Sequence, residues 1–147
     1  MDAVRPAQTL AVTRGVCRLF LDLGFSPVRE VSLPTGRRVD VAGIGKGGEI
    51  IVAEVKSGPE DFKTDSKWTE YPDFCDRFFF AVGPDFPVTL VPEDRGLIIA
   101  DRHGGAVVRE GADTPLHASR RKAMTLRLAR LAAERLARLA DPDHVLT

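Results

Sequence analysis

Long hydrophobic runs are absent from this 147-residue chain, and so are several patterns that mark common kinds of site. No apolar stretch approaches the ~20 residues that a membrane-spanning helix needs, so we expect no contact with a membrane. Met1–Pro6 lacks a basic segment followed by an apolar one, which predicts that there is no secretory signal. Two cysteines are too few for a disulfide framework, and no Cys/His spacing indicates a zinc site. We therefore expect Cys17 and Cys75 to be buried free thiols in a cytoplasmic protein.

An excess of charge of either sign is also absent, because 21 basic residues balance 21 acidic ones. The basic residues are concentrated late in the chain. Residues 117–140 carry seven Lys or Arg against one Glu, a local charge of +6, so the rest of the chain is negative. Such a segment on a neutral protein can meet nucleic acid, or the acidic part of its own or another chain. Composition alone does not decide between these partners.

The spacing of apolar residues predicts an α/β protein with a mixed β-sheet core flanked by helices. The length suits a single domain over residues 1–147. We expect helices over about 6–23, 59–71 and 116–140, and strands over about 27–33, 37–44, 49–57, 77–82, 96–100 and 106–109.

The most informative stretch is a predicted β-hairpin, in which two runs rich in β-branched residues flank Gly45–Gly48. If Ile44 pairs with Ile50, Asp40 lies opposite Glu54, with the side chains about 5 Å apart. Two carboxylates placed in this way are destabilising unless a cation compensates them. Mg2+ or Mn2+ suits this position because hard cations prefer oxygen ligands. The opposite face of the hairpin is apolar and must lie on a core; it carries Val39, Val41, Gly43, Ile51, Ala53 and Val55.

Asp40, Glu54 and Lys56 together suit phosphodiester chemistry. A divalent cation held by the two acids polarises a phosphodiester and lowers the pKa of a bound water. Lys56 lies two residues beyond Glu54 and points to the same side of its strand. There it can orient the attacking water or stabilise charge on the phosphate. The alternative is a charge cluster on a solvated sheet end, where such pairs contribute about 0–1 kcal/mol.

Asp40 followed by Glu54-Val55-Lys56 on adjacent strands, together with Asp65-x-Lys67-Trp68-x-x-Tyr71, resembles the MmcB-like DNA repair family of the PD-(D/E)XK nuclease superfamily. The resemblance extends from the first helix to about Val108. It implies a restriction-endonuclease-like fold and a role in DNA repair. It also implies that Asp40 and Glu54 are metal ligands and that Lys56 is the catalytic lysine. The first helix departs from the pattern, because it offers no acid where some of these nucleases place one.

Several further residues are candidates for contact with DNA: Arg38, Lys63, Lys67, Trp68 and Tyr71. For Trp68 the alternative is packing on the sheet. Asp76 precedes an interior strand, and we expect it to be a structural hydrogen-bonding group.

The basic C-terminal helix, about 116–140, has three interpretations. Its apolar residues Met124, Leu128, Leu131 and Leu139 can form a packing face, with the arginines solvated. Its arginines can instead contact the DNA backbone. The helix can also form a homodimer interface.

Two functions of different classes follow from these observations. The first is a Mg2+-dependent DNA nuclease that acts in DNA repair. The second is a catalytically inactive nuclease-fold module that binds DNA or a repair protein. The first predicts cleavage that needs the cation and Asp40, and the second predicts binding that needs neither.

Overall fold

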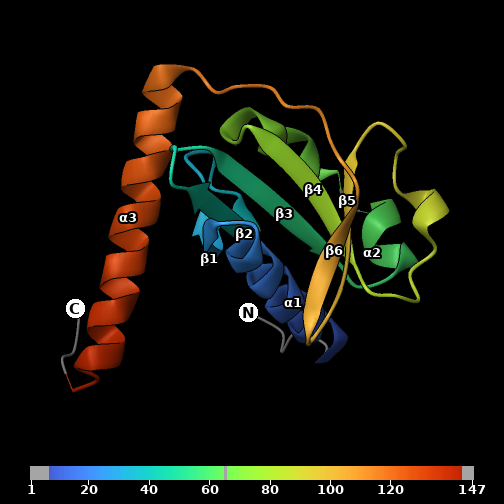
Figure 1. Cartoon of the computed structure of the whole chain (residues 1–147), viewed down its shortest axis with the longest axis horizontal. Helices are drawn as coiled ribbons and strands as arrows, with labels where there is room; N and C mark the ends of the chain where they lie inside the picture. Colours follow the sequence, from blue (N-terminus) through green and yellow to red (C-terminus); the bar gives the residue numbers. More distant parts are fainter. Residues whose placement is uncertain (1–6, 65, 144–147) are drawn as a thin grey trace.

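The computed structural model describes residues 7–64 and 66–143, which form a mixed six-stranded sheet with helices around it (Figure 1). The strands follow one another across the sheet in the order of the chain. The central strands β3, β4 and β5 run parallel, and the outer pairs are antiparallel. The strands are β1 (Phe25–Ser32), β2 (Arg38–Gly45), β3 (Ile50–Lys56), β4 (Arg77–Val82), β5 (Gly96–Asp101) and β6 (Gly104–Arg109).

The predicted fold class, an α/β protein with a mixed sheet flanked by helices, is confirmed. Five helical segments accompany the sheet in the described residues: α1 (Ala7–Asp22), α2 (Pro59–Thr64), the 3-10 helices η1 (Lys67–Phe74) and η2 (Val88–Leu90), and α3 (Ala118–Ala140). None of the described helices is long and apolar enough to cross a membrane. Of the two cysteines, Cys75 is buried and Cys17 is half-buried, and both are free thiols.

The single helix predicted over 59–71 is wrong, because α2 ends at Thr64 and a separate 3-10 helix, η1, begins at Lys67. Trp68, Tyr71 and Phe74 are spaced by three residues, and a 3-10 helix has three residues per turn, so all three lie on one side of η1. That side packs against the aromatic face of β4. In an α-helix the same three rings would be spread over about 120° of the helix surface, whereas in the 3-10 form they lie in one row that faces the sheet.

Two hydrophobic cores lie on opposite faces of the sheet. The buried face of α1, including Val16 and Phe20, packs on one face with Ile51 of β3. On the other face, η1 and α3 pack on Val52, with Met124 of α3 fully buried there. The strict alternation along β3 explains why this strand is apolar on both sides.

The apolar face predicted for the hairpin is correct except at Val39, which packs in the opposite core from Val41. The alternation of β2 therefore breaks at Asp40. The neighbouring strand breaks at the same level, where Glu30 has a φ of 50°, a left-handed conformation that is uncommon for residues other than glycine. Pairing is kept on both sides of this point, with Arg29 opposite Val41 and residue 31 opposite residue 39. The regular alternation of side chains is therefore interrupted at the same level in β1 and β2, beside the predicted acidic pair.

Asp76 ties three parts of the chain together and has the structural role that the sequence predicts. Its carboxylate accepts hydrogen bonds from the backbone N–H groups of Ile50 (2.7 Å) and Leu116 (2.9 Å). It also forms a two-pronged salt bridge with the Arg121 guanidinium, with N–O distances of 2.6 and 2.7 Å. Burial raises the pKa of Asp76, but the hydrogen bonds from Arg121 and the two N–H groups outweigh burial and lower it to about 2.

Only the first half of α3 packs closely on the body. Met124 and Leu128 are fully buried and Leu131 is half-buried, as the predicted packing face requires. Leu139, which was placed on the same face, is instead 80% exposed. The helix extends beyond the end of the sheet, so its last turns have no apolar surface to cover (Figure 1).

Candidate active site

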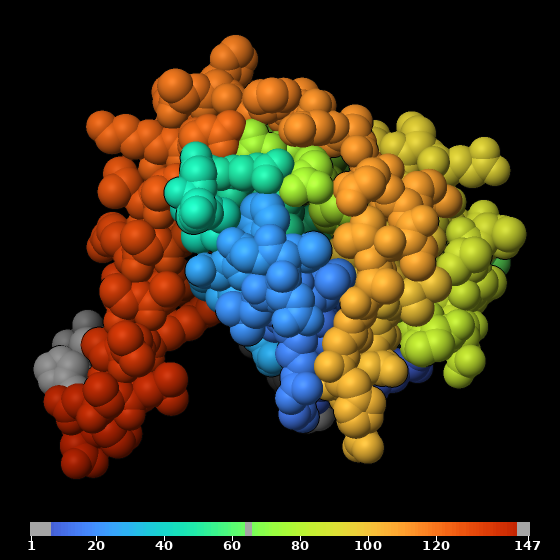
Figure 2. Space-filling model, in the orientation of Figure 1, coloured from blue at the N-terminus to red at the C-terminus, as the bar shows by residue number. Residues whose placement is uncertain are grey.

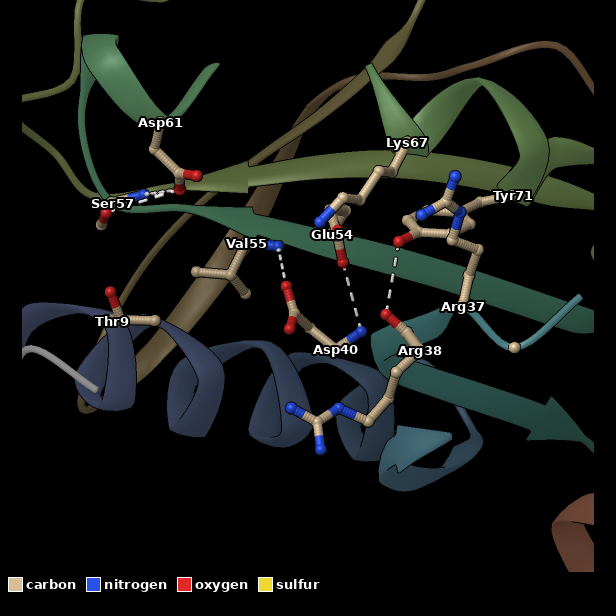
Figure 3. Close-up of a pocket in the computed structure, with 11 residues that line it drawn as sticks. Thr9, Arg37, Arg38, Asp40, Glu54, Val55, Ser57, Asp61, Lys67 and Tyr71 are labelled. Atoms are coloured by element: carbon tan, nitrogen blue, oxygen red, sulfur yellow. Dashed lines mark hydrogen bonds between the residues drawn. The ribbon is translucent and has the colours of Figure 1, made fainter. Parts of the chain in front are cut away.

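A pocket of about 460 Å3 lies at the end of the sheet where β3 ends and β2 begins. Its walls come from the first turn of α1, the start of β2, the end of β3, α2 and η1 (Figure 3). Because β2 and β3 are antiparallel, the start of one strand lies beside the end of the other. Residues far apart in the sequence therefore meet in one hollow.

Asp40 and Glu54 meet in this pocket, as the predicted hairpin register requires. Regular pairing of β2 with β3 is observed from Ile44–Ile50 to Val41–Ala53, in the predicted register. Beyond Val41–Ala53, bonds from backbone to side chain replace the regular pairing. The Asp40 N–H donates to Glu54 Oε1 (3.3 Å), and the Val55 N–H donates to Asp40 Oδ2 (2.8 Å). The two acids are only 7% and 6% exposed. They are therefore held by backbone donors at the bottom of the pocket.

The electrostatics of the pair favour a shared proton or a cation. Burial raises the pKa of Glu54 strongly, and the negative charge of Asp40 and a carboxyl–carboxyl hydrogen bond with Asp40 raise it further. The positive charge of Lys56 acts in the opposite direction. Two buried carboxylates so close together cannot both ionise without compensation. A shared proton or a bound divalent cation would supply that compensation.

Lys56 is placed differently from the sequence-based expectation that it opens onto the pocket beside Glu54. It is 2% exposed and does not line the pocket, although its charge still acts on Glu54. A second lysine does line the pocket: Lys67, from η1, extends its side chain toward Glu54 (Figure 3). The structure thus provides one buried lysine near Glu54 and one accessible lysine.

Of the residues predicted to contact DNA, Arg38, Lys67 and Tyr71 line the pocket. The Tyr71 hydroxyl donates to the backbone carbonyl of Arg38 (3.4 Å), and its ring is buried, so Tyr71 forms part of the pocket wall. Lys63 is exposed on α2 and does not line the pocket. Asp65 of the sequence motif lies outside the described residues.

Trp68 packs on the sheet rather than in the pocket. Its ring stacks on Phe78 at a centroid distance of 6.2 Å and meets Phe80 edge-on at 5.0 Å. The Arg95 guanidinium lies over the indole at 5.2 Å. Trp68 therefore packs on the sheet, which was the alternative to contact with DNA, and its position does not support contact with DNA.

A family model described as "DNA repair protein MmcB-like" matches residues 1–143. The chain belongs to the MmcB-like DNA repair protein family. No curated protein matches this chain.

Two solved structures are similar to this MmcB-like chain. The SPO1766 protein of unknown function from Silicibacter pomeroyi is 40% identical, with a TM-score of 0.92, over 97% of this chain and 98% of that one. A repair endonuclease from Pyrococcus abyssi is 23% identical, with a TM-score of 0.38, over 69% of this chain and 48% of that one. The first shows the same architecture almost end to end, and the second is too distant to assign residues.

Thr9 of the MmcB-like chain lines the pocket, although the sequence did not indicate it. It is 5% exposed, and within the described part of the chain its Oγ1 has no hydrogen-bond partner. Thr9 lies on α1, the helix that lacks the acid found in some nucleases of this type. Its hydroxyl is also an oxygen ligand for water or a cation.

Asp61 is a second pocket residue without a predicted role, although it follows the Glu-x-Lys motif closely. Its carboxylate accepts hydrogen bonds from the backbone N–H (3.1 Å) and the hydroxyl (3.4 Å) of Ser57. These bonds fix the turn between β3 and α2. Asp61 therefore shapes one wall of the pocket.

The donor set of the pocket fits Mg2+. Across residues 7–64 and 66–143, no three His, Cys, Asp or Glu side chains gather as a metal-binding group. Two acids are sufficient for Mg2+, which keeps several waters and binds through one or two carboxylates together with substrate phosphate. The hydroxyl of Thr9, which has no partner in the part of the chain that the structure describes, can offer such waters a hydrogen bond. Asp40 and Glu54 are thus the residues that could hold the ion.

The Glu54→Gln variant is expected to melt at a higher temperature than the wild type at pH 8 without divalent cations. A buried acid with a raised pKa stabilises the fold fully below its ordinary pKa of 4.5, and that stabilisation is lost as the pH rises toward the folded-state pKa. Glutamine does not titrate, so only the wild type loses this contribution to stability. Each kcal/mol corresponds to about 2–4 °C. Thermal melts in EDTA between pH 4 and 9 measure the difference.

The control for this experiment is Glu93→Gln, which removes an exposed acid that does not line the pocket. Its melting curve should follow the wild type at each pH. If the wild type and Glu54→Gln lost stability equally between pH 5 and 9, the Glu54 carboxyl would not be strained in the fold.

Thr9→Val is expected to leave the fold as stable as the wild type or more stable by about 1 kcal/mol, because it removes a buried hydroxyl that has no hydrogen-bond partner among residues 7–64 and 66–143. The same variant should bind Mg2+ less tightly if the hydroxyl holds metal-bound water. Urea unfolding and calorimetric Mg2+ titration measure the two effects. Thr13→Val is the matched control, since the Thr13 hydroxyl already bonds the Thr9 carbonyl (2.8 Å) outside the pocket. Unchanged Mg2+ affinity in Thr9→Val would remove Thr9 from the site.

Proposed function

We propose that this MmcB-like protein is a Mg2+- or Mn2+-dependent DNA nuclease of restriction-endonuclease-like fold that hydrolyses phosphodiester bonds in DNA repair. The observation that supports this proposal is the meeting of Asp40 and Glu54, from adjacent strands, at the bottom of an accessible pocket. The cation held by these acids, when bound, polarises a phosphodiester and lowers the pKa of a bound water.

The chain's own groups support the reaction in distinct ways. Lys56 favours the ionised form of Glu54, because its charge lowers the pKa of that carboxyl. Lys67 extends into the pocket from the opposite wall and can contact an entering phosphate (Figure 3). Arg38 stands at the start of β2 and can contact the same strand of DNA through its guanidinium.

The test is a cleavage assay with purified protein on supercoiled plasmid, a single-stranded oligonucleotide and a duplex, each with Mg2+ or with EDTA. The proposal expects cleavage of at least one substrate with Mg2+ and none with EDTA. Calorimetric titration of Mg2+ into the protein should show one site in the same buffer. Absence of both cleavage and Mg2+ binding would overturn the proposal.

A second candidate function is that of a catalytically inactive module that binds DNA or a repair protein. The burial of Lys56 outside the pocket lining favours this candidate, because a buried lysine cannot touch substrate without rearrangement. Binding of DNA would then fall with salt but would not depend on Mg2+ or on Asp40. The same substrates, followed by fluorescence anisotropy, distinguish the two candidates.

A further inference from the structure

A second hollow, of about 630 Å3, lies between α3 and the edge strand β1. We call it the α3 groove; it is lined by residues of α3 and by Glu30, Ser32 and Arg38 of β1 and β2. Figure 2 shows the opening, where the C-terminal half of α3 stands away from the body of the molecule. Arg38 lines both the α3 groove and the pocket of Asp40 and Glu54, so the two hollows adjoin at this residue.

The α3 groove is predominantly basic. Its charged lining residues are Arg38, Arg127, Arg130 and Arg135 against Glu30 and Glu134. Arg127 donates to the backbone carbonyl of Ser32 (3.0 Å), and Arg135 donates to the carbonyls of Arg29 and Glu30. A carbonyl satisfies a guanidinium hydrogen bond but carries no net charge. These bonds therefore fix Arg127 and Arg135 in position without neutralising their charge, and the lining keeps an excess of two positive charges.

Arg130 is the most accessible of these groups. Its side chain is 79% exposed, and its ion pair with Glu134, one turn further along α3, is long at 3.7 Å. Exposed pairs of this kind contribute little energy, so Arg130 can exchange Glu134 for a stronger anion at small cost. A phosphate is such an anion, because its oxygens match the guanidinium fork.

We propose that the α3 groove binds the sugar-phosphate backbone of the DNA strand that enters the pocket of Asp40 and Glu54. The inference rests on the proposed function for the identity of that pocket. It follows from charge complementarity and from the position of Arg38, which lines both hollows. Arg127 and Arg135 are about 12 Å apart along the helix axis. That distance matches about three or four phosphates of one strand.

A second copy of the chain is a poorer occupant of the α3 groove than DNA. Residues 117–140 carry a net charge of +6, so two copies that meet through α3 would bring like charges together. DNA brings the opposite charge and releases counterions on binding. The homodimer interpretation of this helix is therefore an alternative outcome of the test.

The test compares Arg130→Ala with Arg138→Ala. Both variants remove one exposed arginine from α3, but only Arg130 lines the groove. Binding of fluorescent 20-nucleotide single-stranded and duplex DNA is measured by anisotropy in EDTA at several salt concentrations. Arg130→Ala should weaken binding three- to tenfold and reduce the slope of log K against log salt by about 0.7–0.9. Arg138→Ala should stay within twofold of the wild type.

Two results would overturn the groove proposal. One is equal effects of the two variants on DNA binding. The other is no effect of Arg130→Ala, and a wild-type dimer that Leu136→Glu dissociates would then identify α3 as a homodimer interface. Thermal melts confirm that each variant is folded. Failure of the nuclease proposal has a different signature. In that case no substrate is cleaved, yet the Arg130→Ala difference in binding persists in EDTA. Cleavage without that difference refutes the α3 groove alone.

Discussion

Replacing Asp40 with asparagine is expected to reduce Mg2+-dependent DNA cleavage by about 10³-fold or more, equivalent to about 4 kcal/mol of transition-state stabilisation. The substitution removes one of two acidic ligands and its charge. The asparagine carbonyl can still accept the hydrogen bond from the Val55 N–H, so the backbone conformation at this point of β2 is kept. Cleavage rates of wild type and Asp40→Asn on the same labelled DNA measure the effect.

Mg2+ provides a second readout that does not depend on catalysis. A ligand that binds only the folded state stabilises it by about 2.7 kcal/mol at a hundred times its dissociation constant. Mg2+ should therefore raise the melting temperature of the wild type and not that of Asp40→Asn. Asp85→Asn is the control, because Asp85 is exposed and does not line the pocket. An Asp40→Asn protein that cleaved at the wild-type rate would show that the reaction occurs elsewhere.

Asp76→Ala is expected to destabilise the fold by about 3–5 kcal/mol. The substitution leaves the N–H groups of Ile50 and Leu116 without their acceptor and removes the partner of the Arg121 guanidinium. These three groups belong to β3, to the segment before α3 and to α3 itself. The start of α3 should therefore loosen together with the start of β3. Urea denaturation, with the midpoint converted to a free energy, measures the loss.

The pH dependence of the same variant gives an independent check. The pKa of Asp76 is lowered from 3.8 to about 2, so the stability that its carboxylate contributes is present above about pH 4 and is lost as the pH falls through 2. Asp76→Ala should lack this loss. Asp73→Ala, three residues earlier and exposed, is the control and should match the wild type. Equal urea midpoints for Asp76→Ala and the wild type would contradict the assigned role.

The parts of the structure that the sequence predicts well depend on short-range information. A three- or four-residue Gly-rich turn fixes the register of its hairpin, so placing Ile44 opposite Ile50 also placed Asp40 beside Glu54. The strand at Arg77–Val82 is apolar on both sides, and its interior position follows directly. The fold class could be predicted from the order of the helices and strands alone.

The parts that the sequence does not predict depend on contacts between distant segments. Val39 packs in the opposite core from Val41, and β1 has a matching irregularity at Glu30. Neither Val39 nor Glu30 is a residue type that predicts such a change. The 3-10 form of η1 depends on the aromatic surface of β4. The alternation along β3 predicts that Lys56 points to the same side as Glu54, yet Lys56 is 2% exposed and does not line the pocket. Thr9 reaches the pocket only because α1 crosses the sheet at that level.

The guanidinium groups of α3 have a consequence for the assembly state of the sheet. β1 is an edge strand, and its outward carbonyls at Arg29, Glu30 and Ser32 are occupied by Arg135 and Arg127. A strand from another molecule cannot form a continuous ladder there, because the acceptors it needs are already bonded and the helix stands in its path. The basic helix thus prevents this edge from acting as a template for intermolecular β-strand addition and fibril growth.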